Sequence, residues 1–135
     1  MNHITQISTT DVSEPTPNIF SNCLKVGSQV FISGMTAGDN AGGILGDGSA
    51  EDQSRQCLNK IKCLVEEAGG SLSDIVILTV FLTDINHRVE FGKVRREIFI
   101  GVMPCSTLIE GYHFAQPNLV VEVDAIAVLN SDTNT

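Results

Sequence analysis

The sequence predicts an α+β fold in which two helices pack against one mixed β-sheet. Two segments, after Ser49 and after Arg88, repeat their apolar residues at the spacing of an amphipathic helix. Five short runs rich in apolar and β-branched residues lie around these segments and are typical of strands. Strands and helices in this order favour one sheet that is covered by the two helices.

A chain of 135 residues has the length of a single domain, 1–135, and its net charge of −8 repels phosphate backbones and anionic lipid headgroups. We therefore expect no nucleic-acid partner and no membrane partner. The first twenty residues lack the basic start and apolar run of a secretion signal, which favours a cytoplasmic protein with four reduced cysteines. Polar residues at 1–16 and 130–135 predict a tail at each end.

The folded region begins with a predicted β-hairpin. Its strands are IFSNCLKV (19–26) and QVFISGM (29–35), joined by the turn Val26-Gly27-Ser28. A glycine-rich segment, 37–48, follows and is interpreted as a strand-like loop. Its acidic residues lack the spacing of a calcium loop, and no cysteine or histidine cluster has the spacing of a zinc site, so we expect no metal.

Helices and strands alternate in the rest of the chain. Ser49 caps a helix that Gly69-Gly70 ends, and the apolar run 75–84 predicts a strand covered on both faces. A second helix is predicted over 89–99, where Gly92 weakens it by about 1 kcal/mol relative to Ala. Two further strands, 105–113 and 119–129, are separated by a turn at Pro117.

The stretch MPCSTLIEGYHF (103–114) holds the residue types of a nucleophilic active site. If 105–113 is a strand, Cys105 and His113 share one face roughly 26 Å apart, and Ser106 and Glu110 share the other face roughly 13 Å apart. Catalytic pairs need atoms within about 3.2 Å, so a partner must come from another strand or another subunit. The ordinary interpretation of Cys105 is a small buried apolar residue.

Glu122 and Asp124 are the strongest acid candidates, because they lie in VVEVDAIAVL (120–129), a strand otherwise made of apolar residues. Composition alone favours the interpretation that both carboxylates face solvent on the outer side of the sheet. His87 and His113 are weaker candidates for a general base.

Several stretches together resemble the reactive-intermediate deaminase (Rid, or YjgF) family. The resemblance is carried by IFSNCLKVGSQVFISGM, by QSRQCLNKIKCLVEEAGGSLSDIVILTVFLTDI, and by MPCSTLIEG with VVEVDAIAVL. It implies a chorismate-mutase-like α+β fold, a mixed six-stranded sheet with two helices packed on one face. It also implies a homotrimer that binds small molecules in clefts between subunits and hydrolyses enamines or imines without a cofactor.

The resemblance implies site residues as well as departures from the family pattern. Ser106 takes the place of the arginine that grips a substrate carboxylate, Phe20 that of a tyrosine, and Gly92 that of an asparagine. Glu122 matches the acid that orients the hydrolytic water and is the implied catalytic residue. The implied substrate-binding residues are Phe20, Ser33, Gly34, Gly92, Cys105, Ser106 and Thr107.

Three functions remain open at this point. The chain could hydrolyse an enamine or imine other than a simple 2-iminoacid, because a charge-assisted contact worth roughly 1.5 to 3 kcal/mol is missing. It could instead be a non-catalytic trimeric protein that binds a small molecule or a partner. Thiol chemistry at Cys105 is the third, and it requires a basic neighbour from an adjacent subunit, such as Arg88, Arg95 or Arg96.

Overall fold

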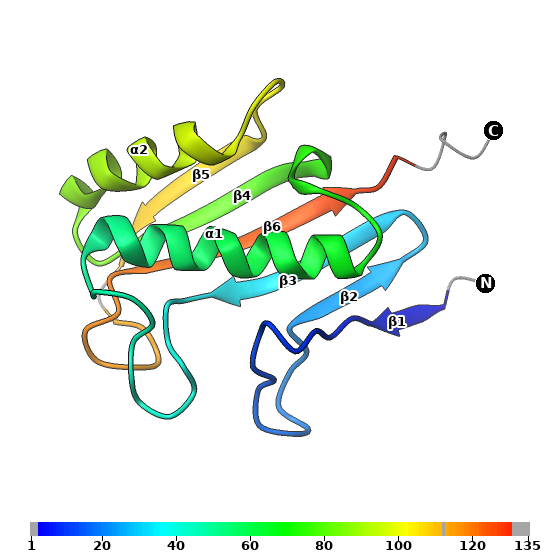
Figure 1. Ribbon diagram of the computed structural model, residues 1–135, viewed down its shortest axis with the longest axis horizontal. Coiled ribbons are helices and arrows are strands. Elements are labelled where there is room, and N and C mark those ends of the chain that lie inside the picture. Colours follow the sequence, from blue (N-terminus) through cyan, green and yellow to red (C-terminus); the bar gives the residue numbers. More distant parts are fainter. Residues whose placement is uncertain (1–2, 112, 131–135) are drawn as a thin grey trace.

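The computed structural model describes residues 3–111 and 113–130, which form a six-stranded sheet with two α-helices (Figure 1). The strand order across the sheet is β1-β2-β3-β6-β4-β5. The strands are β1 (Ile4–Gln6), β2 (Cys23–Val26), β3 (Gln29–Met35), β4 (Ile75–Leu82), β5 (Cys105–Glu110) and β6 (Val121–Val128).

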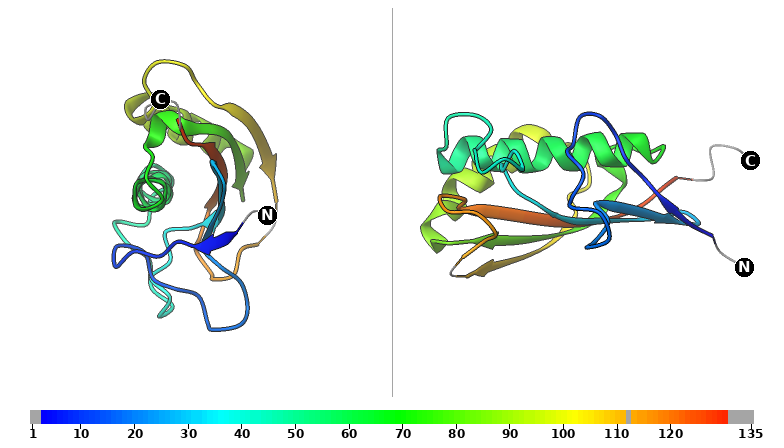
Figure 2. Two further views of the ribbon diagram at one scale, coloured as in Figure 1. Left: turned by 90° about the vertical axis from the view of Figure 1, so that its right-hand side faces the viewer. Right: turned by 90° about the horizontal axis from the view of Figure 1, so that it is seen from below.

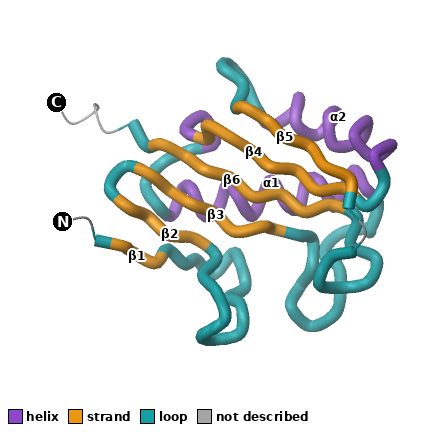
Figure 3. Tube along the Cα trace, turned by 180° about the vertical axis from the view of Figure 1, so that it is seen from behind, coloured by secondary structure: helices purple, strands orange, loops and turns teal. Residues whose placement is uncertain are grey.

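Strand β6 lies in the middle of the sheet and pairs in antiparallel register with β3 on one side and β4 on the other (Figure 3). The predicted hairpin is present as β2 and β3, and Gly27 turns it with a φ of 60°. Strand β5 pairs in parallel with β4, so the chain must cross over between them, and it does so through α2.

Helix α1 (Ala50–Glu67) begins and ends as the sequence predicts. The Ser49 hydroxyl accepts a hydrogen bond from the N–H of Asp52, which satisfies one free donor of the first turn. At the other end Gly69 takes a φ of 101°, a conformation that favours glycine, and the N–H of Gly70 donates to Val65 O. The helix packs over β6 and β3.

Helix α2 (Arg88–Ile98) lies beside α1 on the same face of the sheet (Figure 2). It buries Phe91 and Val94, as its apolar spacing predicts. Two ion pairs join the helices: Arg55 to Glu97 at 2.8 Å and Lys93 to Glu51 at 3.0 Å. Short 3-10 turns at Leu72–Asp74 and Ile85–His87 precede β4 and α2. The predicted fold class is confirmed.

The hydrophobic core lies between the helices and the sheet. Alternate residues of β6 face the helices and are buried, namely Val121, Val123, Ala125 and Ala127. Their neighbours point to the opposite side of the sheet, which no helix of the described residues covers and which we call the open face. The residues of β4, β5 and β6 that share this face are Ile77, Thr79, Phe81, Cys105, Thr107, Ile109, Glu122, Asp124 and Ile126.

Three segments near the predicted hairpin differ from the prediction. Residues 4–6, expected to belong to a tail, form the edge strand β1, and Val12 is buried in the core. The sequence gives no signal for β1, because its three side chains are all exposed and apolar and polar residues do not alternate along it. The glycine-rich segment 37–48 forms only one isolated bridge, between Gly38 and Ile44. The predicted strand 19–26 begins only at Cys23.

The last part of the chain needs one further correction. Strand β5 ends at Glu110, so His113 lies beyond it and shares no strand face with Cys105. Residues 131–135, most of the expected C-terminal tail, lie outside the described residues. Within the part of the chain that the structure describes, no helix is long and apolar enough to cross a bilayer.

Candidate functional site

A cleft of about 550 Å³ opens at the end of the sheet where β3 ends and β6 begins. Three connections gather around it: the segment between β1 and β2, the glycine-rich segment after β3, and the segment before β6 (Figure 1). Its lining residues are Val12 to Pro17, Phe20, Asn22, Gly34, Met35, Thr36, Asn40, Lys60, Ala115, Gln116, Leu119 and Glu122.

Hydrogen bonds tie these connections to one another. The buried Asn22 donates its side-chain amide to Ser13 O at 2.9 Å, and Asn40 donates to Glu14 O at 3.0 Å. Gln116 donates to Gly43 O at 3.2 Å, which joins the segment before β6 to the glycine-rich segment. The walls of the cleft therefore hold their shape without regular secondary structure.

Glu122 is the second residue of β6 and is half-buried at the cleft. Burial raises the pKa of its carboxyl above the ordinary value of 4.5, and the negative charge of Asp124 on the same face raises it further. Among the described residues, no ion pair or hydrogen bond involves this carboxylate. A carboxylate in this state keeps its capacity to accept a proton from a bound water or ligand.

A β-bulge in β3 places Gly34 against Glu122. The register of β3 on β6 shifts between Ile32 and Met35, so that one extra residue is accommodated at the cleft edge. A Cβ on Gly34 would lie 2.5 Å from Glu122 Oε2 and 2.8 Å from its Cδ. Glycine at this position therefore leaves the space that the carboxylate occupies.

Lys60 is a cleft residue that the sequence analysis missed. It comes from α1, is half-buried, and donates from Nζ to Gly38 O at 2.8 Å. Burial lowers the pKa of its ammonium group. A signal was present in the sequence: Gln53, Cys57, Lys60 and Leu64 follow the helical spacing of the buried stripe, so a lysine interrupts an otherwise uncharged row. Asn40 and Gln116, on irregular segments, gave no such signal.

Three of the residues singled out in the sequence meet at the cleft: Phe20, Gly34 and Glu122. Glu122 does lie on the outer side of the sheet, as composition favours, but it is half-buried at the cleft and not fully exposed to solvent. Ser33 lies next to the cleft and lines a neighbouring hollow of about 430 Å³ together with Phe20 and Asp124. The Ser33 hydroxyl donates to Ser21 O at 2.6 Å, so its proton is already engaged in a hydrogen bond with the backbone.

The residues at the start of β5 are remote from Glu122 within one chain. Cys105 pairs with Ile77 and Glu122 with Phe81, four residues along β4, and β4 separates β5 from β6. Strand geometry then places Cys105 and Glu122 roughly 16 Å apart. Cys105 and Thr107 share the open face with Glu122, whereas Ser106 points to the other side. Gly92 lies on α2 and lines none of these hollows.

The four cysteines are free and differ in accessibility. Cys105 is exposed, so its interpretation as a buried apolar residue is wrong. Cys23 and Cys57 are buried, and burial raises their pKa values to about 11 and about 12. No group of three or more His, Cys, Asp or Glu side chains among residues 3–111 and 113–130 is arranged to hold a metal ion.

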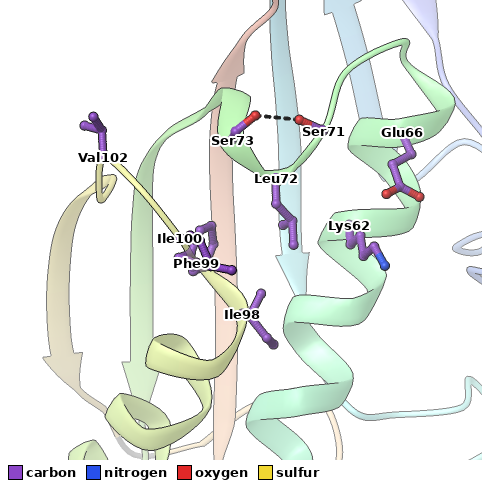
Figure 4. A pocket seen from close by; sticks show the side chains of 9 residues that line it. All are labelled: Lys62, Glu66, Ser71, Leu72, Ser73, Ile98, Phe99, Ile100 and Val102. Carbon is purple, nitrogen blue, oxygen red and sulfur yellow. Dashed lines mark hydrogen bonds between the residues drawn. The ribbon is translucent and has the colours of Figure 1, made fainter.

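A second hollow of about 250 Å³ lies between the end of α1 and the segment after α2 (Figure 4). Ile98 and Leu72 point toward one another across it, and Ser71 and Ser73 form a hydrogen bond at its rim. Its charged residues, Lys62 and Glu66, are exposed on α1. None of the sequence-predicted site residues lines it, and we regard the Glu122 cleft as the candidate site.

A profile of the family described as Endoribonuclease L-PSP matches residues 12–129 of the chain. The chain belongs to this family, the Rid (YjgF) family. RutC family proteins of two archaea are similar to it. That of Pyrococcus abyssi is 32% identical over 80% of this chain and 84% of the relative, and that of Pyrococcus horikoshii is 33% identical over 80% and 85%.

Solved structures agree with this membership. A protein of unknown function from Pseudomonas aeruginosa is 33% identical, covers 96% of this chain and 95% of its own, and superposes with a TM-score of 0.86. RidA from the Antarctic bacterium Psychrobacter sp. PAMC 21119 is 29% identical, with 93% of this chain and 99% of its own covered and a TM-score of 0.81. The fold is therefore that of the Rid family.

Proposed function

We propose that the chain is a Rid-type hydrolase that acts on the C=N bond of an imine or the tautomeric enamine. The observation that carries the proposal is Glu122, a half-buried carboxylate with a raised pKa and no ion-pair partner among the described residues, at the wall of a cleft of about 550 Å³. A raised pKa brings a carboxyl closer to the working pH, which suits a general base.

In the proposed reaction Glu122 takes a proton from a water molecule while the water oxygen bonds to the imine carbon. The electron pair of the C=N bond moves to nitrogen, which takes the proton held by Glu122, and a tetrahedral carbinolamine results. Glu122 then transfers the carbinolamine O–H proton to the amino nitrogen, the O–H electron pair forms the C=O bond as the C–N bond breaks, and ammonia and a carbonyl compound are released. The imine and one water are consumed, and no oxidant or cofactor is required.

We further propose that three chains assemble with their open faces toward a common axis. The open face carries exposed apolar residues, including Phe31, Ile109 and Val128, which would otherwise contact water. In such an assembly the start of β5 from one chain could complete the cleft of its neighbour with Cys105 and Thr107, which lie on the open face. These residues offer hydroxyl and thiol groups and no cation, so the substrate is not held there by an arginine.

Ammonia release from a panel of freshly generated imines and enamines tests the proposal. Wild-type protein should accelerate release from at least one compound, and Glu122→Gln should reduce that rate by about a hundredfold or more, the lower range of general base catalysis. Glu66→Gln, which removes an exposed acid of α1, is the control and should keep the wild-type rate. Light scattering should give the mass of three chains.

The second candidate is a non-catalytic binding protein with the same cleft, and the exchange of three family groups at Phe20, Gly92 and Ser106 favours it. A panel without any ammonia release, together with an intact trimer and a small molecule bound in the cleft, would support this candidate. The RNA cleavage named in the family description is disfavoured, because a net charge of −8 repels a polyanion.

A further inference from the structure

Lys60 is the only cationic residue among the described residues that line the Glu122 cleft. It projects from the middle of α1, on the buried stripe of that helix, and not from the start of β5, where the resemblance places the family arginine. A lysine at this position places a positive charge within a partly desolvated wall, which is costly unless negative or polar groups compensate it.

Other groups of the chain compensate the positive charge of Lys60 only in part. An ammonium group has three N–H donors, and Lys60 uses one of them, for Gly38 O at 2.8 Å. No carboxylate of the described residues lies within 4.0 Å of its Nζ. The negative charge of Asp39 favours the charged form of Lys60, but the Asp39 carboxylate accepts hydrogen bonds from the N–H groups of Ala41 and Gly43 and forms no ion pair with Lys60.

Lys60 and Glu122 therefore occupy one cleft without neutralising each other. They come from different elements, α1 and β6, and form no ion pair. A ligand with an anionic group and a reactive carbon could contact both, the anion at Lys60 and the carbon at Glu122. Asn40 and Gln116 add amide groups to the same wall.

We infer that Lys60 is the residue that binds the anionic group of the substrate, and that the cleft takes a carboxylate-bearing enamine or imine held from α1. The inference rests on the proposed function for the identity of the reacting bond. Because Lys60 and Glu122 are not in contact, the carboxylate and the C=N carbon need not be adjacent atoms of the ligand. The chain then keeps a cationic contact with the substrate anion, but the cation comes from α1 and not from the start of β5.

The test compares a small carboxylate with its uncharged amide. Crotonate and crotonamide have the same planar carbon skeleton and differ in charge, and their binding to the intact protein can be measured by ligand-observed NMR. Lys60→Met keeps the aliphatic stem and removes the charge, while Lys60→Arg restores a charge. Lys62→Met is the matched control, since Lys62 is two residues along the same helix, is exposed, and lines the other hollow.

We expect crotonate to bind wild-type protein more tightly than crotonamide, and Lys60→Met to weaken crotonate binding about tenfold or more, as for a lost charge-assisted hydrogen bond. Crotonamide binding should stay within about twofold, which shows that the cleft is intact. Lys60→Arg should recover much of the crotonate affinity, and Lys62→Met should leave it unchanged.

The inference is wrong if crotonate fails to bind, if Lys60→Met leaves crotonate binding unchanged or weakens both ligands equally, or if Lys62→Met has the same effect as Lys60→Met. Failure here leaves the proposed reaction intact when Glu122→Gln still abolishes ammonia release. Conversely, charge-selective binding at Lys60 without ammonia release would indicate an anion-binding protein and would contradict the proposed hydrolase function.

Discussion

Gly34 and Glu122 face each other so closely across the bulged end of β3 that a Cβ on Gly34 would lie 2.5 Å from Glu122 Oε2. Real side-chain carbons do not approach an oxygen that closely, so any larger residue at position 34 must displace the carboxylate. The relationship links one glycine of the sequence to the position of the proposed base.

Gly34→Ala should therefore reduce hydrolysis strongly with a moderate effect on stability. We expect a loss of about tenfold or more in the rate of ammonia release, because a misplaced base is poorly aligned, and an overpacking cost of about 1 to 2 kcal/mol. Steady-state kinetics and urea unfolding measure the two effects. A variant with a wild-type rate would show that the carboxylate does not need its present position.

Gly92→Ala provides the contrasting case of a helical glycine with space around it. A Cβ there would lie 3.6 Å from Arg96 Nη1, an ordinary contact, and the residue is inside α2. Replacing it should raise the free energy of unfolding by about 0.5 to 1 kcal/mol through helix propensity. Unchanged ammonia release in this variant would argue against Gly92 as a substrate-binding residue, whereas a reduced rate with normal stability would support that assignment.

Gln53 should be a major stabilising residue although it is polar. It is fully buried and forms three hydrogen bonds with the backbone, donating to Gly48 O and Asn118 O and accepting from the N–H of Val120. Gln53→Leu leaves those backbone groups without partners and should lower the free energy of unfolding by about 3 kcal/mol. Gln56→Leu, on the same helix but not buried, should change it by less than about 0.5 kcal/mol. Chemical denaturation distinguishes the two variants.

The raised pKa of Glu122 predicts how stability depends on pH. The folded protein holds this proton to higher pH than the unfolded chain does, so ionisation of Glu122 destabilises the fold as pH rises from 4.5 through the raised pKa. Glu122→Gln cannot ionise and should match wild type below pH 4.5 and exceed it in stability above the raised pKa. Thermal unfolding across this range measures the difference.

Asp124→Asn supplies a check on the cause of that shift. Burial is the larger cause and Asp124 the smaller, so removing the Asp124 charge should lower the pKa of Glu122 only in part. The acid limb of the pH profile for ammonia release should then move to lower pH with the maximal rate preserved. An unchanged profile would contradict the assignment of Glu122 as the titrating base.

Thiol labelling should follow burial. Cys105 is exposed and should react first with iodoacetamide in the native protein. Cys23 and Cys57, whose pKa values are raised to about 11 and about 12, should react only on unfolding. Mass spectrometry of digested protein identifies the labelled positions. Labelling of Cys105 that becomes faster when the trimer dissociates would support its place at a subunit interface.

The helices and the longer strands could be predicted because each has a periodic signal. Apolar spacing and the cap at Ser49 gave α1, and β-branched runs gave β4 and β6. The edge strand β1 could not be predicted, because short exposed strands depend on pairing with a neighbour and not on burial of their own side chains. The prediction extended β5 to residue 113, although Gly111, a residue type that commonly bounds strands, directly follows Glu110.

The cleft was accessible from the sequence only in part. Glu122 and Gly34 lie on strands, and the family resemblance points to them. Lys60, Asn40 and Gln116 reach the cleft through the course of three connections that lack periodicity, and their convergence depends on tertiary hydrogen bonds such as that from Asn40 to Glu14 O. Spacing along a chain does not encode such contacts.

The central position of β6 also constrains how the chain is made. This strand is translated after the other five, yet it lies between β3 and β4 and pairs with both. Until it leaves the ribosome, β3 and β4 each present an unpaired edge to other chains in the crowded cell. Synthesis that stops before Val121 would leave a fragment prone to aggregation, so premature termination there should yield insoluble or degraded product.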